Sequence, residues 1–324
     1  MEKLRVGIIG LGMMGVFHAK IYKNLPDVEL MGGYDVYQAP AEKFADILGV
    51  KIYASLDDMF REVDAVSICT PDHLHKEPVL KALAAGVRCL VEKPLATSTA
   101  DCAEILAARP DPTYLMVGHP LRFDPRVWHA RTAVQSGALG KTSSINIWRN
   151  NSRSAGEKIC QYTSVAWFLG SHDIDAVHFI TGKKVVKVTA TGKNFFAPHY
   201  DYVISNMELE DGTLVMMQNG FTLPDERVTT MDGGIKIIGE KGMIEVDMNH
   251  NSVRLTTQEV GRSTMQDTHH WPLINGEHYG DLRVELEAFV RTAIKKELPP
   301  VTGEDGAEAV RVIELITAYL DGQK

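Results

Sequence analysis

Short apolar runs alternate with amphipathic segments over the first third of the chain. The helical patterns begin at residues that can cap a helix, such as Ser55 and Ser98, or end at a glycine. Strands that alternate with helices predict a parallel, doubly wound sheet, so we assign residues 1–120 to a Rossmann domain of an α/β protein. The expected strands are 6–9, 28–34, 65–70, 87–91 and 114–117, and the expected helices are 41–48, 77–85 and 98–108.

The pattern changes after residue 120, where long strand candidates follow one helix at 125–136. Turns such as Asp211-Gly212 join several of these strands as hairpins. We therefore expect a C-terminal α+β domain over residues 121–324, with a large, mostly antiparallel sheet and closing helices near 282–296 and 306–320. The expected strands are 143–148, 185–191, 202–209, 214–221, 235–238, 243–246 and 253–256.

One face of this second sheet is expected to be apolar. The residues that would form it are Met207, Leu209, Leu214, Val215, Met216 and Met217. The domain's own helices could cover them, but a bare apolar face of this size would favour a subunit interface. The pattern thus predicts a homodimer or a homotetramer.

Composition narrows the class of protein. The chain has 324 residues and a net charge of −8, which argues against a nucleic-acid surface. No run is long and apolar enough to span a membrane. The four cysteines form no C-x-x-C pair, which favours reduced thiols and a cytoplasmic location. The histidines show no helical H-x-x-x-H pair, so we expect no metal site.

A glycine-rich turn follows the first strand. Gly10, Gly12 and Gly15 form G-x-G-x-x-G, and Asp35 closes the second strand twenty residues later. Gly10 allows the tight turn, Gly12 lets a pyrophosphate approach the backbone, and Gly15 lets the helix pack close to the sheet. The N–H groups at the helix start, Met13-Met14, would face the phosphates, and Asp35 would accept from the ribose hydroxyls. This context predicts a bound dinucleotide, with NAD favoured over NADP.

Ligands of an open parallel sheet bind at the carboxyl ends of its strands. Three further strand ends therefore matter for chemistry, and the second of them places Lys93 at the mouth of a strand, held extended by the proline that follows. The three segments are Thr70-Pro71 with His75, Glu92-Lys93-Pro94, and Gly118-His119-Pro120 leading to Arg122.

Taken together, these motifs resemble the Gfo/Idh/MocA (glucose–fructose oxidoreductase, inositol dehydrogenase and rhizopine-catabolism) family of nicotinamide-dependent oxidoreductases. They occur in family order over nearly the whole chain. They are the glycine loop, Thr70-Pro71 with His75, Glu92-Lys93-Pro94, Arg122-Phe123-Asp124-Pro125, Ser171-His172-Asp173-Ile174-Asp175, Glu285-Leu286-Glu287-Ala288-Phe289 and Pro300-Val301-Thr302-Gly303.

The resemblance implies reversible hydride transfer at the nicotinamide C4, with a sugar or cyclitol as substrate. It makes Lys93 a catalytic or substrate-orienting residue and His172 the proton shuttle. Ser171 looks like the N-cap of a helix over 172–181. The helix dipole would then disfavour protonation of His172. We therefore expect the rate of alcohol oxidation to fall toward acid pH with an apparent pKa at or below about 6.5. Asp175 would orient His172 or bond Lys93, or else tether the helix to its domain.

The chain departs from the inositol dehydrogenases of this family at one position. They carry an aspartate four residues before the histidine, where this chain has Phe168. A lysine–aspartate–histidine triad therefore cannot be transferred whole, and an aromatic contact to a pyranose ring is an alternative role for Phe168. Further substrate contacts are expected at Arg122, Arg149, Asn150 and Tyr162, while His278-Tyr279 could line the same cleft.

Three functions remain open from these residues. The first is an NAD(H)-dependent dehydrogenase that acts on a sugar, a sugar derivative or a cyclitol. The second is a lyase, epimerase or glycoside-cleaving enzyme that oxidises a sugar hydroxyl and regenerates a retained NAD. The third is a regulator that senses a dinucleotide and a sugar without turnover. The presence of both Lys93 and His172 favours an enzyme.

Overall fold

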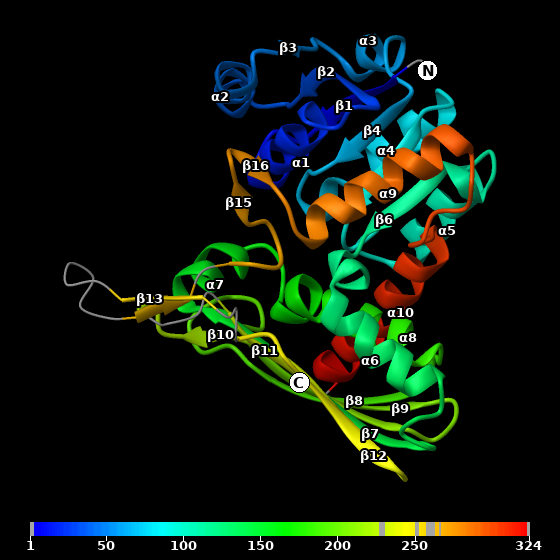
Figure 1. The fold of residues 1–324 in the computed structure, drawn as a ribbon, viewed down its shortest axis with the longest axis vertical. Coiled ribbons are helices and arrows are strands. Elements are labelled where there is room, and N and C mark those ends of the chain that lie inside the picture. The colour runs from blue at the N-terminus through cyan, green and yellow to red at the C-terminus, as the bar shows by residue number, and fades with distance from the viewer. Residues whose placement is uncertain (1–2, 227–230, 250–252, 257–262, 266, 323–324) are drawn as a thin grey trace. The chain divides into compact units, whose positions relative to one another are not determined.

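The computed structural model describes residues 3–226, 231–249, 253–256, 263–265 and 267–322. Its contacts divide the chain into two compact units (Figure 1). The first unit comprises residues 1–120 and 270–310, and the second comprises 121–269 and 311–324. Residues 270–310 thus pack with the first unit, whereas their position in the chain had placed them with the second.

The first unit is built on a six-stranded parallel sheet with the order β3-β2-β1-β4-β5-β6. This is the doubly wound order of a Rossmann fold, as the sequence predicted. Its strands are β1 (Leu4–Ile9), β2 (Val28–Tyr34), β3 (Lys51–Ile52), β4 (Ala65–Ile68), β5 (Arg88–Glu92) and β6 (Leu115–Gly118), and its helices are α1 (Met13–Lys23), α2 (Gln38–Leu48), α3 (Leu56–Phe60), α4 (Lys76–Ala84), α5 (Thr99–Ala108) and α9 (Asp281–Lys295).

Local sequence explains where several of these helices begin and end. The hydroxyls of Ser55 and Ser98 accept from the third backbone N–H of α3 and α5, which confirms both as N-caps. Gly49 ends α2 in the left-handed conformation. Short connections complete the unit, namely the turns η1 (Asp72–Leu74) and η2 (Pro112–Tyr114) and the hairpin β15 (Leu273–Ile274) with β16 (Glu277–His278).

The second unit is built on a six-stranded sheet with the order β12-β11-β7-β10-β9-β8. Among the described residues β7 and β10 pair parallel and the other neighbouring strands pair antiparallel, which confirms a mostly antiparallel sheet. Its strands are β7 (Thr142–Ser152), β8 (Val185–Lys193), β9 (Tyr202–Leu209), β10 (Leu214–Leu223), β11 (Asp232–Gly239) and β12 (Gly242–Asp247), with a short pair β13 (Arg254–Thr256) and β14 (Ser263–Met265).

Helical segments cover one face of this sheet. They are η3 (Pro120–Phe123), α6 (Pro125–Gln135), α7 (Arg153–Ile159), the π-helical turn η4 (Ala166–Gly170) and α8 (Ser171–Thr181). The last helix, α10 (Gly303–Gly322), begins in the first unit and ends in the second. The sequence had not predicted α7 or η4.

The predicted apolar face is divided between the two sides of the sheet. Met207, Val215 and Met217 point to the covered side and are at most 4% exposed, while Leu214 and Met216 are 59% and 46% exposed. Side chains alternate along a strand, so four consecutive residues cannot share one face. The single apolar face expected from residues 207–217 was therefore wrong.

Ser171 is not an N-cap. The backbone before α8 is already helical at Gly170, and the η4 turn runs directly into the helix. The Ser171 hydroxyl instead donates to the carbonyl of Phe168 at 3.5 Å. His172 consequently lies inside a continuous helical segment, and the helix-dipole argument for its low pKa does not hold.

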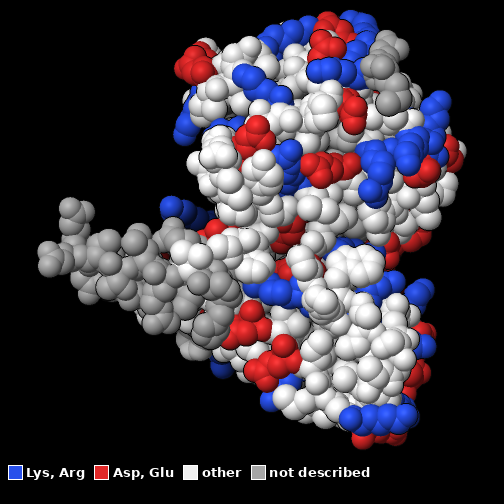
Figure 2. Space-filling view, viewed as in Figure 1, with Lys and Arg blue, Asp and Glu red and all other residues white. Residues whose placement is uncertain are grey.

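Several smaller findings concern the described residues as a whole. None of the described helices is long and apolar enough to cross a membrane. No group of three or more His, Cys, Asp or Glu side chains in the described ranges is placed to hold a metal ion. The four cysteines are free. On the face drawn in Figure 2, basic and acidic side chains are interspersed.

Candidate functional site: a dinucleotide cradle and a clamped helix

The glycine loop connects β1 to α1 as the sequence predicted, and each glycine has a separate steric reason. Gly10 has a φ of +87°, and a Cβ there would lie 2.6 Å from the Thr70 nitrogen. A Cβ on Gly15 would lie 2.1 Å from the Gly10 oxygen, so only glycine lets α1 approach the loop this closely. A Cβ on Gly12 would meet nothing within 4 Å.

The space above Gly12 fits a pyrophosphate. Helix α1 begins at Met13 with no side-chain cap and no acidic residue in its first turn, so its free N–H groups suit an anion. The Thr70 hydroxyl at the end of β4 is buried and makes no hydrogen bond to any described residue. An orphaned hydroxyl and an open cradle beside the same turn are what a bound dinucleotide would use.

Asp35 lies at the end of β2, as the fingerprint requires. One carboxylate oxygen accepts from the Leu11 backbone N–H at 2.8 Å, and the other accepts from the Tyr37 N–H at 2.9 Å. These bonds fix the carboxylate against the glycine loop. Its negative charge then lies where the adenosine ribose of a dinucleotide binds in this fold.

His75 ties together two of the predicted strand ends. Its Nδ1 lies 2.7 Å from the carbonyl oxygen of Pro94 and its Nε2 lies 2.9 Å from that of Thr70. The side chain is 1% exposed, and this burial lowers its pKa although the two carbonyls oppose the shift. His75 therefore acts by holding the Thr70-Pro71 and Glu92-Lys93-Pro94 segments together, and its own ring atoms are enclosed. The Lys93–Pro94 peptide bond is cis.

In the second unit a buried ion pair holds α8 against the sheet. Arg149 on β7 and Asn219 on β10 are register neighbours on the covered face. Both donate to the Asp173 carboxylate, Arg149 Nε at 2.8 Å and Asn219 Nδ2 at 2.7 Å. Burial raises the pKa of Asp173, and the two donors act against that rise.

A second buried ion pair holds the same helix on another side. Arg122 donates to the Asp175 carboxylate through Nε and Nη2, at 2.9 Å to Oδ2 and 2.7 Å to Oδ1. Both side chains are buried. Because Asp173 and Asp175 are two residues apart, they leave α8 on different sides, and the helix carrying His172 is fixed in rotation.

The remaining predicted substrate residues are described within the unit to which each belongs. Asn150 lies on the open face of the sheet, opposite to Arg149, and donates to Asp232 at 3.0 Å. Tyr162 is exposed. The Phe168 ring packs near Phe221 at 6.1 Å between centroids. His278 packs edge-on against Phe17 in the first unit.

Sequence reasoning missed three polar residues that the structure makes central. Asp173 stood in a quoted motif without a role and Asn219 stood in none, because their contact depends on which elements are neighbours in space. His18 lies one turn beyond Gly15 on α1 and bonds Glu92 at 3.0 Å. The sequence offered one signal for His18, namely a polar residue on the side of the first helix that faces the sheet.

The fold and the cradle define an NAD-binding Rossmann oxidoreductase. The family model described as "Oxidoreductase family, NAD-binding Rossmann fold" matches residues 4–119, and that described as "Oxidoreductase family, C-terminal alpha/beta domain" matches residues 133–319. The chain belongs to the Gfo/Idh/MocA family, as its motifs predicted.

Relatives within the family carry different activities in their names. The chain is 28% identical to a myo-inositol 2-dehydrogenase of Thermotoga maritima, over 95% of this chain and 93% of that one. It is also 28% identical to a 2,7-anhydro-N-acetylneuraminate hydratase of Mediterraneibacter gnavus, over 76% of this chain and 68% of the relative.

The fold has counterparts among solved structures. One is a scyllo-inositol dehydrogenase from Lactobacillus casei with bound NAD(H) and scyllo-inositol. It superposes with a TM-score of 0.83 at 21% identity, covering 100% of this chain and 98% of the other. At this identity the likeness concerns the fold.

Proposed function

We propose that the protein transfers a hydride reversibly between NAD(H) and a secondary hydroxyl or keto group of a sugar, a sugar derivative or a cyclitol. The observation that carries the proposal is the open cradle above Gly12, next to an orphaned Thr70 hydroxyl and one strand away from Lys93. The names of relatives support the substrate class. When bound, NAD supplies the hydride acceptor at its nicotinamide C4.

Two residues of this chain would serve the proton transfer that accompanies the hydride. Lys93 at the end of β5 is the first, because a cationic nicotinamide and partial burial would favour its neutral form. His172 on the clamped helix α8 is the second. Either group can take the proton from the alcohol oxygen in one direction and return it to the ketone oxygen in the other.

The charge of Asp35 should set the cofactor preference. A carboxylate repels a 2′-phosphate, and the residues that follow, Val36-Tyr37-Gln38, carry no positive charge to neutralise one. We therefore expect NADH to bind more tightly than NADPH. Replacement of Asp35 by alanine should narrow the difference, and equal affinity of the unchanged protein for both would overturn this preference.

A substrate screen tests the proposed function directly. Sugars, inositols and amino-sugar derivatives are offered with NAD, and keto sugars with NADH, while absorbance at the nicotinamide band is followed. For a substrate found in this way, Lys93→Ala should keep NADH affinity and lose at least roughly a hundredfold in turnover, the lower end for a general acid–base group. Near-parental turnover of that variant would leave Lys93 a purely structural residue.

Redox-neutral chemistry is the second candidate, and the hydratase relative favours it. In that case the cofactor would oxidise a hydroxyl, assist elimination or addition, and be returned to its starting state. NAD(H) retained through purification, together with product formed without net change of nicotinamide absorbance, would distinguish this function from a dehydrogenase.

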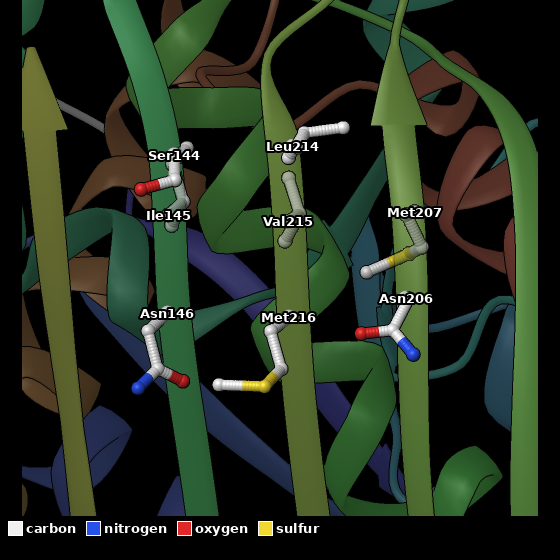
Figure 3. Close-up of a pocket in the computed structure, with 8 residues that line it drawn as sticks. All are labelled: Ser144, Ile145, Asn146, Asn206, Met207, Leu214, Val215 and Met216. Atoms are coloured by element: carbon white, nitrogen blue, oxygen red, sulfur yellow. The ribbon is translucent and has the colours of Figure 1, made fainter.

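We also propose a homodimer or homotetramer formed through the open face of the second sheet. This face carries the exposed side chains of Ile204, Leu214, Met216, Ile238 and Met243. Figure 3 shows a groove on this face. The groove is lined by Ser144 and Asn146 on β7, Leu214 and Met216 on β10, and Asn206 on β9. The four free cysteines suit a reducing, cytoplasmic compartment.

A further inference from the structure

A buried polar chain runs from α1 to the backbone of Lys93. His18 Nε2 lies 3.0 Å from Glu92 Oε1, and Glu92 Oε2 accepts from the Lys93 N–H at 3.3 Å. The side chains of His18 and Glu92 are 1% and 12% exposed. Because Lys93 follows Glu92 directly, whatever fixes this carboxylate also fixes the start of the turn that carries the lysine.

The protonation states of the Glu92 carboxylate and the Cys69 thiol follow from their surroundings. Burial alone would raise the pKa of Glu92, but the hydrogen bond from His18 and the charges around it bring that pKa below its usual value. An ionised carboxylate can only accept, so His18 Nε2 is the donor. Cys69 Sγ lies 3.6 Å from His18 Nδ1, and burial keeps the pKa of this thiol high. The Cys69 thiol therefore keeps its proton where it faces Nδ1.

The other ionisable groups near His18 and Glu92 come from four elements. Tyr22 is on α1 with His18, Cys69 follows β4, His75 precedes α4, and Glu285 is on α9. The Tyr22 hydroxyl forms a hydrogen bond with the Ser67 hydroxyl at 2.8 Å. Among these groups His18 donates the hydrogen bond to the Glu92 side chain.

We propose that His18 is a positioning residue for Lys93: it holds the Glu92 carboxylate, and Glu92 holds the backbone of the Glu-Lys-Pro turn. The inference rests on the proposed function, since it assigns Lys93 to the chemical step. It adds a contribution from the helix of the glycine loop to the placement of that lysine. A shift of the turn by about 1 Å is enough to cost a large factor in rate.

Two amide variants that differ by one methylene group test whether the donor to Glu92 reaches it. In His18→Gln the side-chain amide can place its nitrogen where Nε2 lies and keep the donor to Glu92. In His18→Asn the shorter amide replaces Nδ1 and cannot reach that carboxylate. Melting temperature and NADH titration are measured for both, and we expect NADH affinity within about twofold of the parent because the glycine loop is unchanged.

Kinetics with the identified substrate give the main readout. His18→Asn should lower kcat roughly ten- to a hundredfold with little change in KM, whereas His18→Gln should recover most of the rate. Equal rates in the two variants would overturn the inference. If His18→Asn does not fold, Glu92→Gln removes the charge at constant volume, and an unchanged kcat in that variant would also overturn it.

One measurement is independent of turnover. Carbon-13 titration of the glutamate carboxyls, with Glu92 assigned by its loss in Glu92→Gln, should show a higher midpoint for Glu92 in His18→Asn than in the parent. The midpoint should be unchanged in His18→Gln. An unmoved midpoint contradicts the positioning inference even if the enzyme is active. A moved midpoint in a protein that turns over no sugar or cyclitol supports the hydrogen-bonded link and rejects the proposed function instead.

Discussion

At the scale of single residues, Gly12 and Gly15 serve different purposes although they stand three positions apart. A Cβ on Gly15 would collide with the Gly10 carbonyl, whereas one on Gly12 would enter open space that a pyrophosphate would fill. Gly15→Ala should therefore lower the free energy of unfolding by a few kcal/mol, as strain in a packed site does. Gly12→Ala should leave stability nearly unchanged and weaken NADH binding. Urea unfolding and NADH titration of both variants check this, and the reverse pattern would contradict the assignment.

The burial of His75 predicts a pH dependence of stability. Its folded-state pKa is lowered from 6.5, so below that pH the unfolded chain takes up a proton that the native protein does not. Stability should therefore fall as pH decreases from 6.5 toward the folded-state pKa, by at most about 1.4 kcal/mol per pH unit. Unfolding free energies are measured at pH 7.5 and 5.5 for the parent and for His75→Asn. The difference between their pH slopes gives the contribution of His75 to the pH dependence of stability. A parent and variant with the same pH slope would show that His75 does not contribute.

At the scale of elements, helix α8 is held by the Arg149–Asp173 pair. Arg149→Met would leave the Asp173 carboxylate buried with Asn219 as its remaining partner in this cluster, and we expect a loss of about 3–5 kcal/mol in unfolding free energy. The double variant Arg149→Met with Asp173→Leu should recover much of that loss, since no unpaired charge remains. Arg153→Met, which breaks the exposed pair with Glu157, is the matched control and should change stability little. Additive losses in the double variant would argue against a coupled pair.

At the scale of the whole molecule, the open face of the second sheet predicts the oligomeric state. Met216→Lys would place a charge among the exposed apolar side chains of that face and should dissociate the assembly. Ile47→Lys, at an exposed apolar position on α2, should not. Light scattering coupled to size exclusion at micromolar concentration checks both, and a monomeric parent protein would reject the proposed interface.

The sequence by itself determined the dinucleotide cradle. A glycine's conformational freedom, a serine cap and a run of buried residues act over a few positions, so the tight turn at Gly10, the close helix packing at Gly15 and the strand ends could be predicted. The alternation of strands and helices also predicted a parallel, doubly wound sheet, because right-handed crossovers leave few arrangements.

Only the tertiary structure decided which distant residues meet. The helical backbone does not begin at Ser171, because the η4 turn runs directly into α8 through Gly170, which lies close to Asn219 on β10. Likewise His18 meets Glu92 because the strand order β1-β4-β5 brings the end of β5 close to α1, the helix that follows β1. These pairs depend on burial and on which elements are neighbours, and a local pattern of side chains contains neither.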